Sequence, residues 1–167
     1  MFDDPVTIID TSSIYPFCDK DPFNSKSNMT HALIARNIMR SFSEVPDSGN
    51  IGFCAPFRAQ IKLMKKISEN EAYKENVSIG TVHTFQGDEK ATVIFDSVES
   101  LGEDWHIFIP HGQQSPSKSS TLTVAVSRAE QKLIFIANLR YLDEKIPAQG
   151  YFRHILHKAQ ETGKVID

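Results

Sequence analysis

Three segments of the chain carry side chains that could do chemistry. They are IGFCAPFRAQ at residues 51–60, GTVHTFQGDEK at residues 80–90 and LTVAVSRAE at residues 122–130. In the second segment, Gly87 would let the backbone approach a ligand closely, because glycine has no Cβ. In the third, Arg128 stands among small apolar residues, where a cation is costly unless it meets an anion. These residue types favour sites for a polar, negatively charged ligand.

Apolar runs and helical spacings indicate which elements would position these segments. Strands are expected at residues 6–10, 51–55, 77–82, 92–96 and 133–137, and helices at about 30–42, 57–67, 123–129 and 148–160. Strands that alternate with helices predict an α/β fold, with a mainly parallel sheet flanked by helices. A length of 167 residues predicts a single domain over residues 1–167.

The ends of the predicted elements indicate where ligands would bind. Sheets of this class place their ligand sites at the carboxyl ends of their strands, which directs attention to the residues after Ala55, Val82, Asp96 and Ala137. Asn28 or Thr30 could cap the first helix.

Composition narrows the class of protein. The chain is 40% hydrophobic and 23% charged, which excludes collagen-like and disordered classes. The net charge of −3 counts against a protein that binds nucleic acid through a basic face alone. The two cysteines, Cys18 and Cys54, have no paired spacing, so we expect an intracellular, reducing environment, that is, the cytoplasm. No apolar run approaches the roughly 18 residues of a membrane span.

The three segments resemble motifs of superfamily 1 helicases of the Upf1/Dna2 type. IGFCAPFRAQ resembles motif IV, I-G-V-I-T-P-Y-R-A-Q, and TVHTFQGDEKATVIF resembles motif V, T-V-D-S-F-Q-G-R-E-K-D-V-I-I. LTVAVSRAEQKLIFIAN resembles motif VI, L-N-V-A-L-T-R-A-K-x-x-L-I-I-V-G-N. The order and spacing of the motifs also match over residues 51–138. The resemblance implies the second RecA-like lobe of a helicase, which closes over ATP and Mg²⁺ held mainly by an N-terminal RecA-like lobe.

The resemblance also implies a role for individual residues. Arg128 would be the catalytic arginine that reaches the γ-phosphate across the cleft. The nucleotide-binding residues would be Gln86, Gly87 and Glu89. The path of a single strand of DNA or RNA would be lined by Pro56, Phe57, Arg58, Thr81, His83 and Thr84. We expect Arg58, Gly87, Glu89 and Arg128 to lie along one edge of the sheet, facing the other lobe.

Other features depart from the helicase pattern. The sequence contains no G-x-x-x-x-G-K-[ST] loop and no acidic pair for magnesium after a strand, so we expect an excised C-terminal portion that lacks the ATP-binding lobe. Asp88 stands where the family has arginine. A degenerate lobe that binds nucleic acid or protein without ATPase activity is therefore the alternative. A hydrolase that uses Cys54 or a serine is a third hypothesis, for which no G-x-S-x-G elbow exists.

Single residues also have simpler interpretations. Arg128 could form an ion pair with Glu130, Arg58 could be solvated, and Phe57 could belong to the core rather than to a strand-binding surface.

Overall fold

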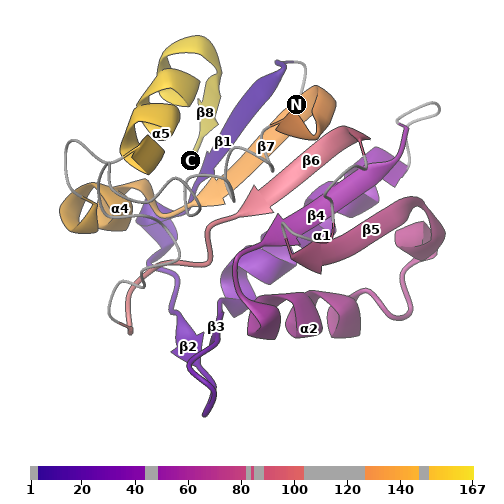
Figure 1. Cartoon of the computed structure of the whole chain (residues 1–167), viewed down its shortest axis with the longest axis horizontal. Coiled ribbons are helices and arrows are strands. Elements are labelled where there is room, and N and C mark those ends of the chain that lie inside the picture. Colours follow the sequence, from indigo (N-terminus) through magenta and orange to yellow (C-terminus); the bar gives the residue numbers. More distant parts are fainter. Residues whose placement is uncertain (1–3, 44–48, 82–83, 85–88, 104–126, 147–150) are drawn as a thin grey trace.

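The computed structural model describes residues 4–43, 49–81, 84, 89–103, 127–146 and 151–167, the first two residues of the last range by their backbone alone. Six strands form one sheet in which every neighbouring pair runs parallel (Figure 1). From one edge to the other, the strands are β5 (Val77–Thr81), β4 (Ile51–Ala55), β6 (Lys90–Asp96), β7 (Ala129–Ala137), β1 (Val6–Asp10) and β8 (Lys164–Ile166). This is the α/β, RecA-like fold that the sequence predicts, with a mainly parallel sheet flanked by helices.

The central strands are apolar on both faces, as expected for a parallel sheet that is covered on both sides. Along β7, Leu133, Phe135 and Ala137 pack into one hydrophobic cluster, and the alternate residues Ile134 and Ile136 pack into another. The alternation follows from the period of two along a strand. The sheet therefore separates two hydrophobic cores.

Helices cover each of these two cores. On one face lie α1 (Met29–Ser43) and α2 (Arg58–Ile67), and on the other lie α4 (Leu139–Lys145) and α5 (Tyr151–Thr162) (Figure 1). The side-chain oxygen of Asn28 accepts a hydrogen bond from the His31 N–H at 3.1 Å, which confirms Asn28 as the N-cap of α1. None of the helices in the described part of the chain has the length and apolarity that a membrane crossing requires.

Short elements fill the connection between β1 and α1, where the sequence predicts only loop. They are η1 (Ser12–Ile14) and the antiparallel pair β2 (Asp19–Lys20) and β3 (Lys26–Ser27). A further short element, η2 (Ala72–Asn76), leads from α2 into β5.

The bounds of the helices and strands differ from the sequence prediction mainly around β7. This strand begins at Ala129 rather than at residue 133, and Arg128 lies in a turn, so the helix expected over residues 123–129 does not extend that far. Residues 123–126 lie outside the described part of the chain. Because Arg128 comes directly before a strand, its position is fixed at the start of β7.

Candidate functional site

Two segments that are far apart in the sequence meet where β6 and β7 begin. Glu89 comes directly before β6, and Arg128 comes directly before β7. The backbone N–H of Lys90 donates a hydrogen bond to the carbonyl oxygen of Arg128 at 2.9 Å. We call this end of the sheet the amino edge. It brings the described end of the motif V segment next to the motif VI arginine.

The side chain of Arg128 is half-buried at the amino edge. Its Nε atom is buried and has no hydrogen-bond partner among the described residues. The described residues also include no carboxylate within ion-pair distance of Arg128, so the simpler interpretation as an ion pair with Glu130 finds no support. An unpaired donor of a cationic side chain costs free energy when it is buried. Arg128 is therefore suited to receive an anion.

A second group lies at the opposite end of the sheet, where strands β4 and β5 finish. Arg58 is exposed at the first position of α2, and Thr81 ends β5. The hydroxyl oxygens of Thr81 and Thr84 lie 3.3 Å apart. Thr84 packs closely against Gly80, because a Cβ added at Gly80 would lie only 2.7 Å from the Cβ of Thr84. Two hydroxyls and one guanidinium thus stand at this carboxyl edge, which Pro56 also borders after β4.

The expectation that Arg58, Gly87, Glu89 and Arg128 share one edge is wrong. Arg58 follows its strand, whereas Glu89 and Arg128 precede theirs, and all these strands run parallel. Residues before and after parallel strands lie at opposite edges, about 20 Å apart over the seven residues of β6. The candidate site therefore consists of two separate groups, one at each edge.

Of the remaining predicted site residues, three lie outside the described part of the chain, and Phe57 lies in the core. Gln86, Gly87 and His83 lie outside the described residues. Phe57 is 1% exposed and packs into the core beneath α1 and α2, with the ammonium group of Lys26 5.9 Å from its ring centroid. Its ring cannot stack on a base in this position, so burial favours the core interpretation of Phe57.

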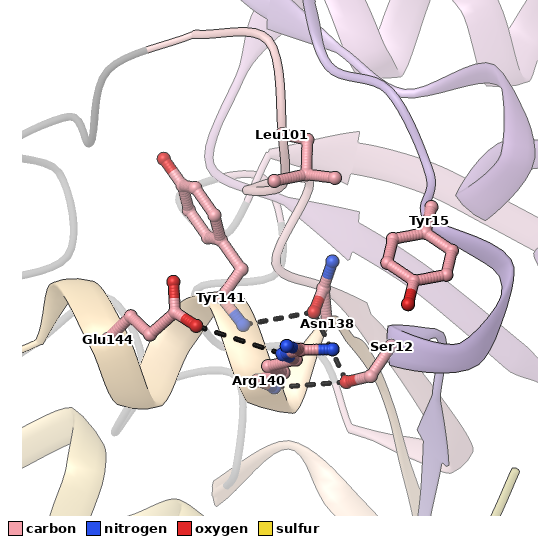
Figure 2. Close-up of a pocket in the computed structure, with 7 residues that line it drawn as sticks. All are labelled: Ser12, Tyr15, Leu101, Asn138, Arg140, Tyr141 and Glu144. Atoms are coloured by element: carbon pink, nitrogen blue, oxygen red, sulfur yellow. Dashed lines mark hydrogen bonds and ion pairs between the residues drawn. The ribbon is translucent and has the colours of Figure 1, made fainter.

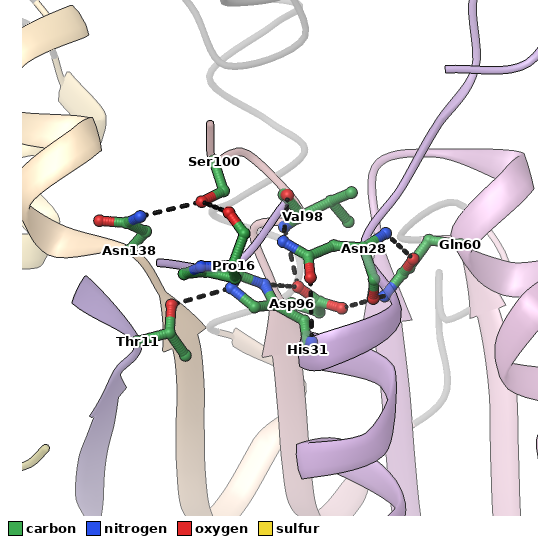
Figure 3. A network of polar contacts seen from close by, with 9 residues as sticks. All are labelled: Thr11, Pro16, Asn28, His31, Gln60, Asp96, Val98, Ser100 and Asn138. Carbon is green, nitrogen blue, oxygen red and sulfur yellow. Dashed lines mark hydrogen bonds and ion pairs between the residues drawn. The ribbon is translucent and has the colours of Figure 1, made fainter. Parts of the chain in front are cut away.

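A buried polar network lies just behind the carboxyl edge (Figure 3). Oδ1 of Asp96, the last residue of β6, accepts hydrogen bonds from Nδ1 of His31 and from the backbone N–H of Val98, both at 2.8 Å. Its Oδ2 accepts from Nε2 of Gln60 at 2.6 Å. Because a carboxylate only accepts, Nδ1 of His31 is the donor to Asp96, and Nε2 on the other side of the ring forms a hydrogen bond with the Thr11 hydroxyl at 2.9 Å.

This Asp–His–Thr order resembles a hydrolytic triad in connectivity only. Thr11, His31 and Asp96 are each at most 1% exposed, so no substrate can reach them. The network instead fixes the start of α2, because Gln60 also accepts from the backbone N–H of Asn28 at 2.7 Å. Arg58 and Gln60 lie on the same helical turn, so the network holds the backbone from which the exposed side chain of Arg58 projects.

Two partial signals of this network are present in the sequence. Asp96 ends a predicted strand, and the segment from Asn28 to Ala32 resembles the family's N-x-x-E-A helix start. Neither signal shows that the side chains of His31 and Asp96 meet across 65 residues of sequence.

A pocket of about 230 Å³ opens beside the ends of β1 and β7 (Figure 2). Its polar groups bind one another: the Ser12 hydroxyl accepts from the Arg140 backbone N–H at 2.9 Å, and the side-chain oxygen of Asn138 accepts from the Tyr141 N–H at 3.0 Å. Asn138, which follows Ala137 at the carboxyl end of β7, lines the pocket, but none of the individual residues to which the resemblance assigned a role does.

The cysteines do not provide a nucleophile. Burial raises the pKa of the Cys54 thiol far above its ordinary value, with a smaller contribution from the negative charge of Asp96. Burial is also the main cause that raises the pKa of Cys18, to about 12. Because the thiolate is the reactive form, the hydrolase hypothesis based on Cys54 has no support.

The fold, and the order of the three motif segments upon it, define a helicase-type α/β domain. A family model described as an AAA domain matches residues 2–140. The chain belongs to this family, the C-terminal region of superfamily 1 helicases of the Upf1/Sen1/Dna2 type.

Three curated proteins illustrate the similarity. The chain is 29% identical to Helicase sen1 of Schizosaccharomyces pombe over 108 residues, which is 63% of this chain and 6% of that protein. It is 31% identical to DNA polymerase alpha-associated DNA helicase A of Saccharomyces cerevisiae over 114 residues, 66% of this chain and 15% of that protein. It is 26% identical to DNA replication ATP-dependent helicase/nuclease DNA2 of Mus musculus over 162 residues, 92% and 14% of the two chains. The chain thus matches a small part of each relative.

Proposed function

We propose that this chain is the second motor lobe of an ATP-dependent DNA or RNA helicase or translocase. In this proposal the amino edge faces ATP held by a first RecA-like lobe, and the carboxyl edge forms part of the track for a single strand. The observation that carries the proposal is the buried Nε of Arg128, which has no partner among the described residues and lies next to the end of the motif V segment. Family membership supports the same assignment.

At the amino edge, Arg128 would act on phosphoryl transfer. A planar guanidinium presents several donors in a fixed fork, which suits phosphate oxygens. Charge grows on those oxygens in the transition state, so a preorganised arginine lowers the barrier more than it strengthens binding. Glu89, together with Gln86 and Gly87, would contact the nucleotide beside it. The first lobe would hold most of ATP and its Mg²⁺, which neutralises the phosphate charge.

At the carboxyl edge, the exposed groups suit a phosphate backbone. Arg58 is a cation that makes no ion pair with a described residue, and Thr81 and Thr84 offer hydroxyl groups nearby in the sheet. Contacts of this kind hold the backbone of a nucleic acid without reading its sequence. His83 would add an imidazole to the same path, and the backbone of Pro56 and Phe57 would shape its border.

In this proposal the amino edge contacts the nucleotide and the carboxyl edge contacts the single strand, so the two tasks are separated by the length of the sheet's strands. The strands β4 and β6 are neighbours, so in this proposal a displacement of the sheet by nucleotide contacts at one end would move the contacts at the other. Packed elements transmit displacements of this kind because the interior is close-packed.

The whole protein that contains this lobe provides the test. We expect its ATPase activity to rise when single-stranded DNA or RNA is added, with the larger response identifying the preferred track. A folded protein whose ATPase does not respond to either strand, or that has no ATPase, would favour the alternative of a degenerate lobe that serves only as a binding module. Asp88, in place of the family's arginine, is the feature that favours this alternative.

A further inference from the structure

A groove with a basic rim runs along the outermost strand on one side of the sheet, away from the amino edge and the carboxyl edge described above. It has a volume of about 670 Å³, within the range of roughly 300–1,000 Å³ that is typical of ligand sites. Residues of α2 and β5 line it, together with residues of the segment between them. β5 is the last strand on that side of the sheet, and α2 lies beside it (Figure 1). Four lysines and one glutamate line it, although the whole chain has a net charge of −3.

The lysines come from two elements and converge on the groove. Lys62, Lys65 and Lys66 are spaced three and four residues apart on α2, so they share one helical face, and Lys74 projects from η2. Lys66 forms an ion pair with Glu69 at 2.6 Å. Lys62 and Lys65 are exposed and form no ion pair with a described residue. Their charges therefore remain available to an acidic ligand.

The floor of the groove is aliphatic. Val77 and Ile79 are alternate residues of β5, so both point to the face that α2 covers, and both are half-buried. Only part of each side chain is covered by the core. An aliphatic side chain placed over them would be removed from water as it binds, which contributes favourable free energy in proportion to the buried area.

The backbone of β5 can also form hydrogen bonds with a ligand, in addition to the charge of the lysines and the aliphatic floor. β5 pairs with β4 on one side and with no described strand on the other. An edge strand presents a row of unpaired N–H and C=O groups, and an extended peptide can add to it as a further strand. The five residues of β5 span about 17 Å, enough to pair with a segment of similar length.

We propose that this groove binds a short, extended peptide segment of a partner protein, with acidic side chains flanking aliphatic ones on one face. The aliphatic side chains pack on Val77 and Ile79, the acidic ones meet Lys62, Lys65 and Lys74, and the peptide backbone pairs with β5. The described lining contains no aromatic ring and no arginine. A nucleic-acid groove normally uses aromatic side chains to stack bases, so the lining favours a peptide over a strand of DNA or RNA.

The direct test uses the 167-residue chain and the labelled peptide Ser-Glu-Thr-Val-Thr-Val-Thr-Glu-Ser, whose alternate side chains place two valines between two glutamates. Fluorescence anisotropy should show binding that weakens as salt is added, because the acidic side chains meet exposed lysines. Backbone amide signals of Val77–Thr81 should shift in NMR spectra. The same peptide with lysine in place of glutamate should bind at least about tenfold more weakly.

Charge reversal locates the site. The double variant Lys62→Glu/Lys65→Glu should weaken peptide binding by about tenfold or more, and these exposed positions should leave the melting temperature unchanged. The matched control is Lys158→Glu/Lys164→Glu, which reverses two exposed lysines on α5 and β8, at the opposite side of the sheet. It should bind the peptide as the unmodified chain does.

Three results would overturn the proposal. They are no peptide binding at millimolar concentration, binding that the Lys62→Glu/Lys65→Glu variant leaves unchanged, and binding without any shift in the β5 amides. An oligothymidylate that binds in a Lys62- and Lys65-dependent way while the peptide does not would assign the groove to nucleic acid instead.

Discussion

The backbone N–H of Lys90 donates a hydrogen bond to the carbonyl oxygen of Arg128 at 2.9 Å, which ties the start of β6 to the turn before β7. This bond joins the backbone at the starts of β6 and β7. The side chain of Arg128 therefore projects from a backbone position that two strands hold. Glu89, one residue earlier, is placed by the same bond. A site built on strands in this way holds its geometry better than one built on loops.

The chain by itself should not hydrolyse ATP. The sequence contains no phosphate-binding loop of the G-x-x-x-x-G-K-[ST] type, and in the proposed function Arg128 acts on a nucleotide that another lobe holds. Phosphate release from ATP, measured with the purified 167-residue chain, should equal the rate of a buffer control. Turnover at about 1 s⁻¹ or faster, which survives further purification, would contradict the two-lobe account.

Single-strand binding by the chain should be weak and sensitive to salt. In the proposed function Arg58 is a cation at the carboxyl edge that meets a phosphate, and removing one such cation should reduce the slope of log K against log salt by about 0.7 for a single strand. We expect Arg58→Ala to reduce both the affinity and this slope, whereas Lys158→Ala on α5 changes neither. Titrations of a labelled oligonucleotide at several salt concentrations measure both quantities. Submicromolar binding that salt does not weaken would show an autonomous binding module instead.

The buried network should contribute measurably to stability. Asp96→Asn keeps the side-chain volume but replaces one acceptor oxygen by an NH₂ group, so Gln60 on one side or His31 and Val98 on the other lose their acceptor. We expect the free energy of unfolding in urea to fall by about 1–3 kcal/mol. Asp143→Asn is the matched control, because Asp143 is 55% exposed and its ion pair with Arg153 spans 3.4 Å. Its effect should stay within about 0.5 kcal/mol, and equal effects of the two variants would argue against the network.

Local signals in the sequence predict much of this fold. The bounds of β1 and β4 match the prediction, because polar residues and Pro56 interrupt each apolar run. The first part of β7 was missed because Glu130 and Lys132 interrupt the apolar pattern there. Among the described strands, β8 pairs only with β1, at the other end of the chain, so no local signal indicates it.

The candidate site was harder to predict than the strands. The sequence shows that Arg128 precedes a strand, but the resemblance to helicases suggested an edge shared with Arg58 and facing the other lobe, and this was wrong. The hydrogen bond between His31 and Asp96 joins residues 65 apart in sequence and depends on packing that no spacing reveals.

The thiols should be unreactive in the folded chain. Burial raises the pKa of Cys18 to about 12, so very little of this thiol is ionised at pH 8. Burial raises the pKa of Cys54 further in the same direction. Labelling with a thiol-reactive chromophore at pH 8 should be very slow in buffer and complete within minutes in urea. Rapid labelling of both cysteines in buffer would show that both cores open, because Cys54 lies in one of them and Cys18 in the other.

The most direct test of the account is the turnover of the whole protein with Arg128→Ala. In the proposed function the guanidinium meets charge that grows only in the transition state, so ATP hydrolysis with saturating single strand should fall by roughly 10³-fold, about 4 kcal/mol of barrier, while ATP affinity stays nearly intact. Arg128→Lys should restore little, because an ammonium group lacks the planar fork of donors. Arg140→Ala, beyond the other end of β7, removes an arginine that is 65% exposed and should leave turnover unchanged. A folded Arg128→Ala protein with near-normal turnover would contradict the account, and unfolding of that variant would show that Arg128 serves the structure instead.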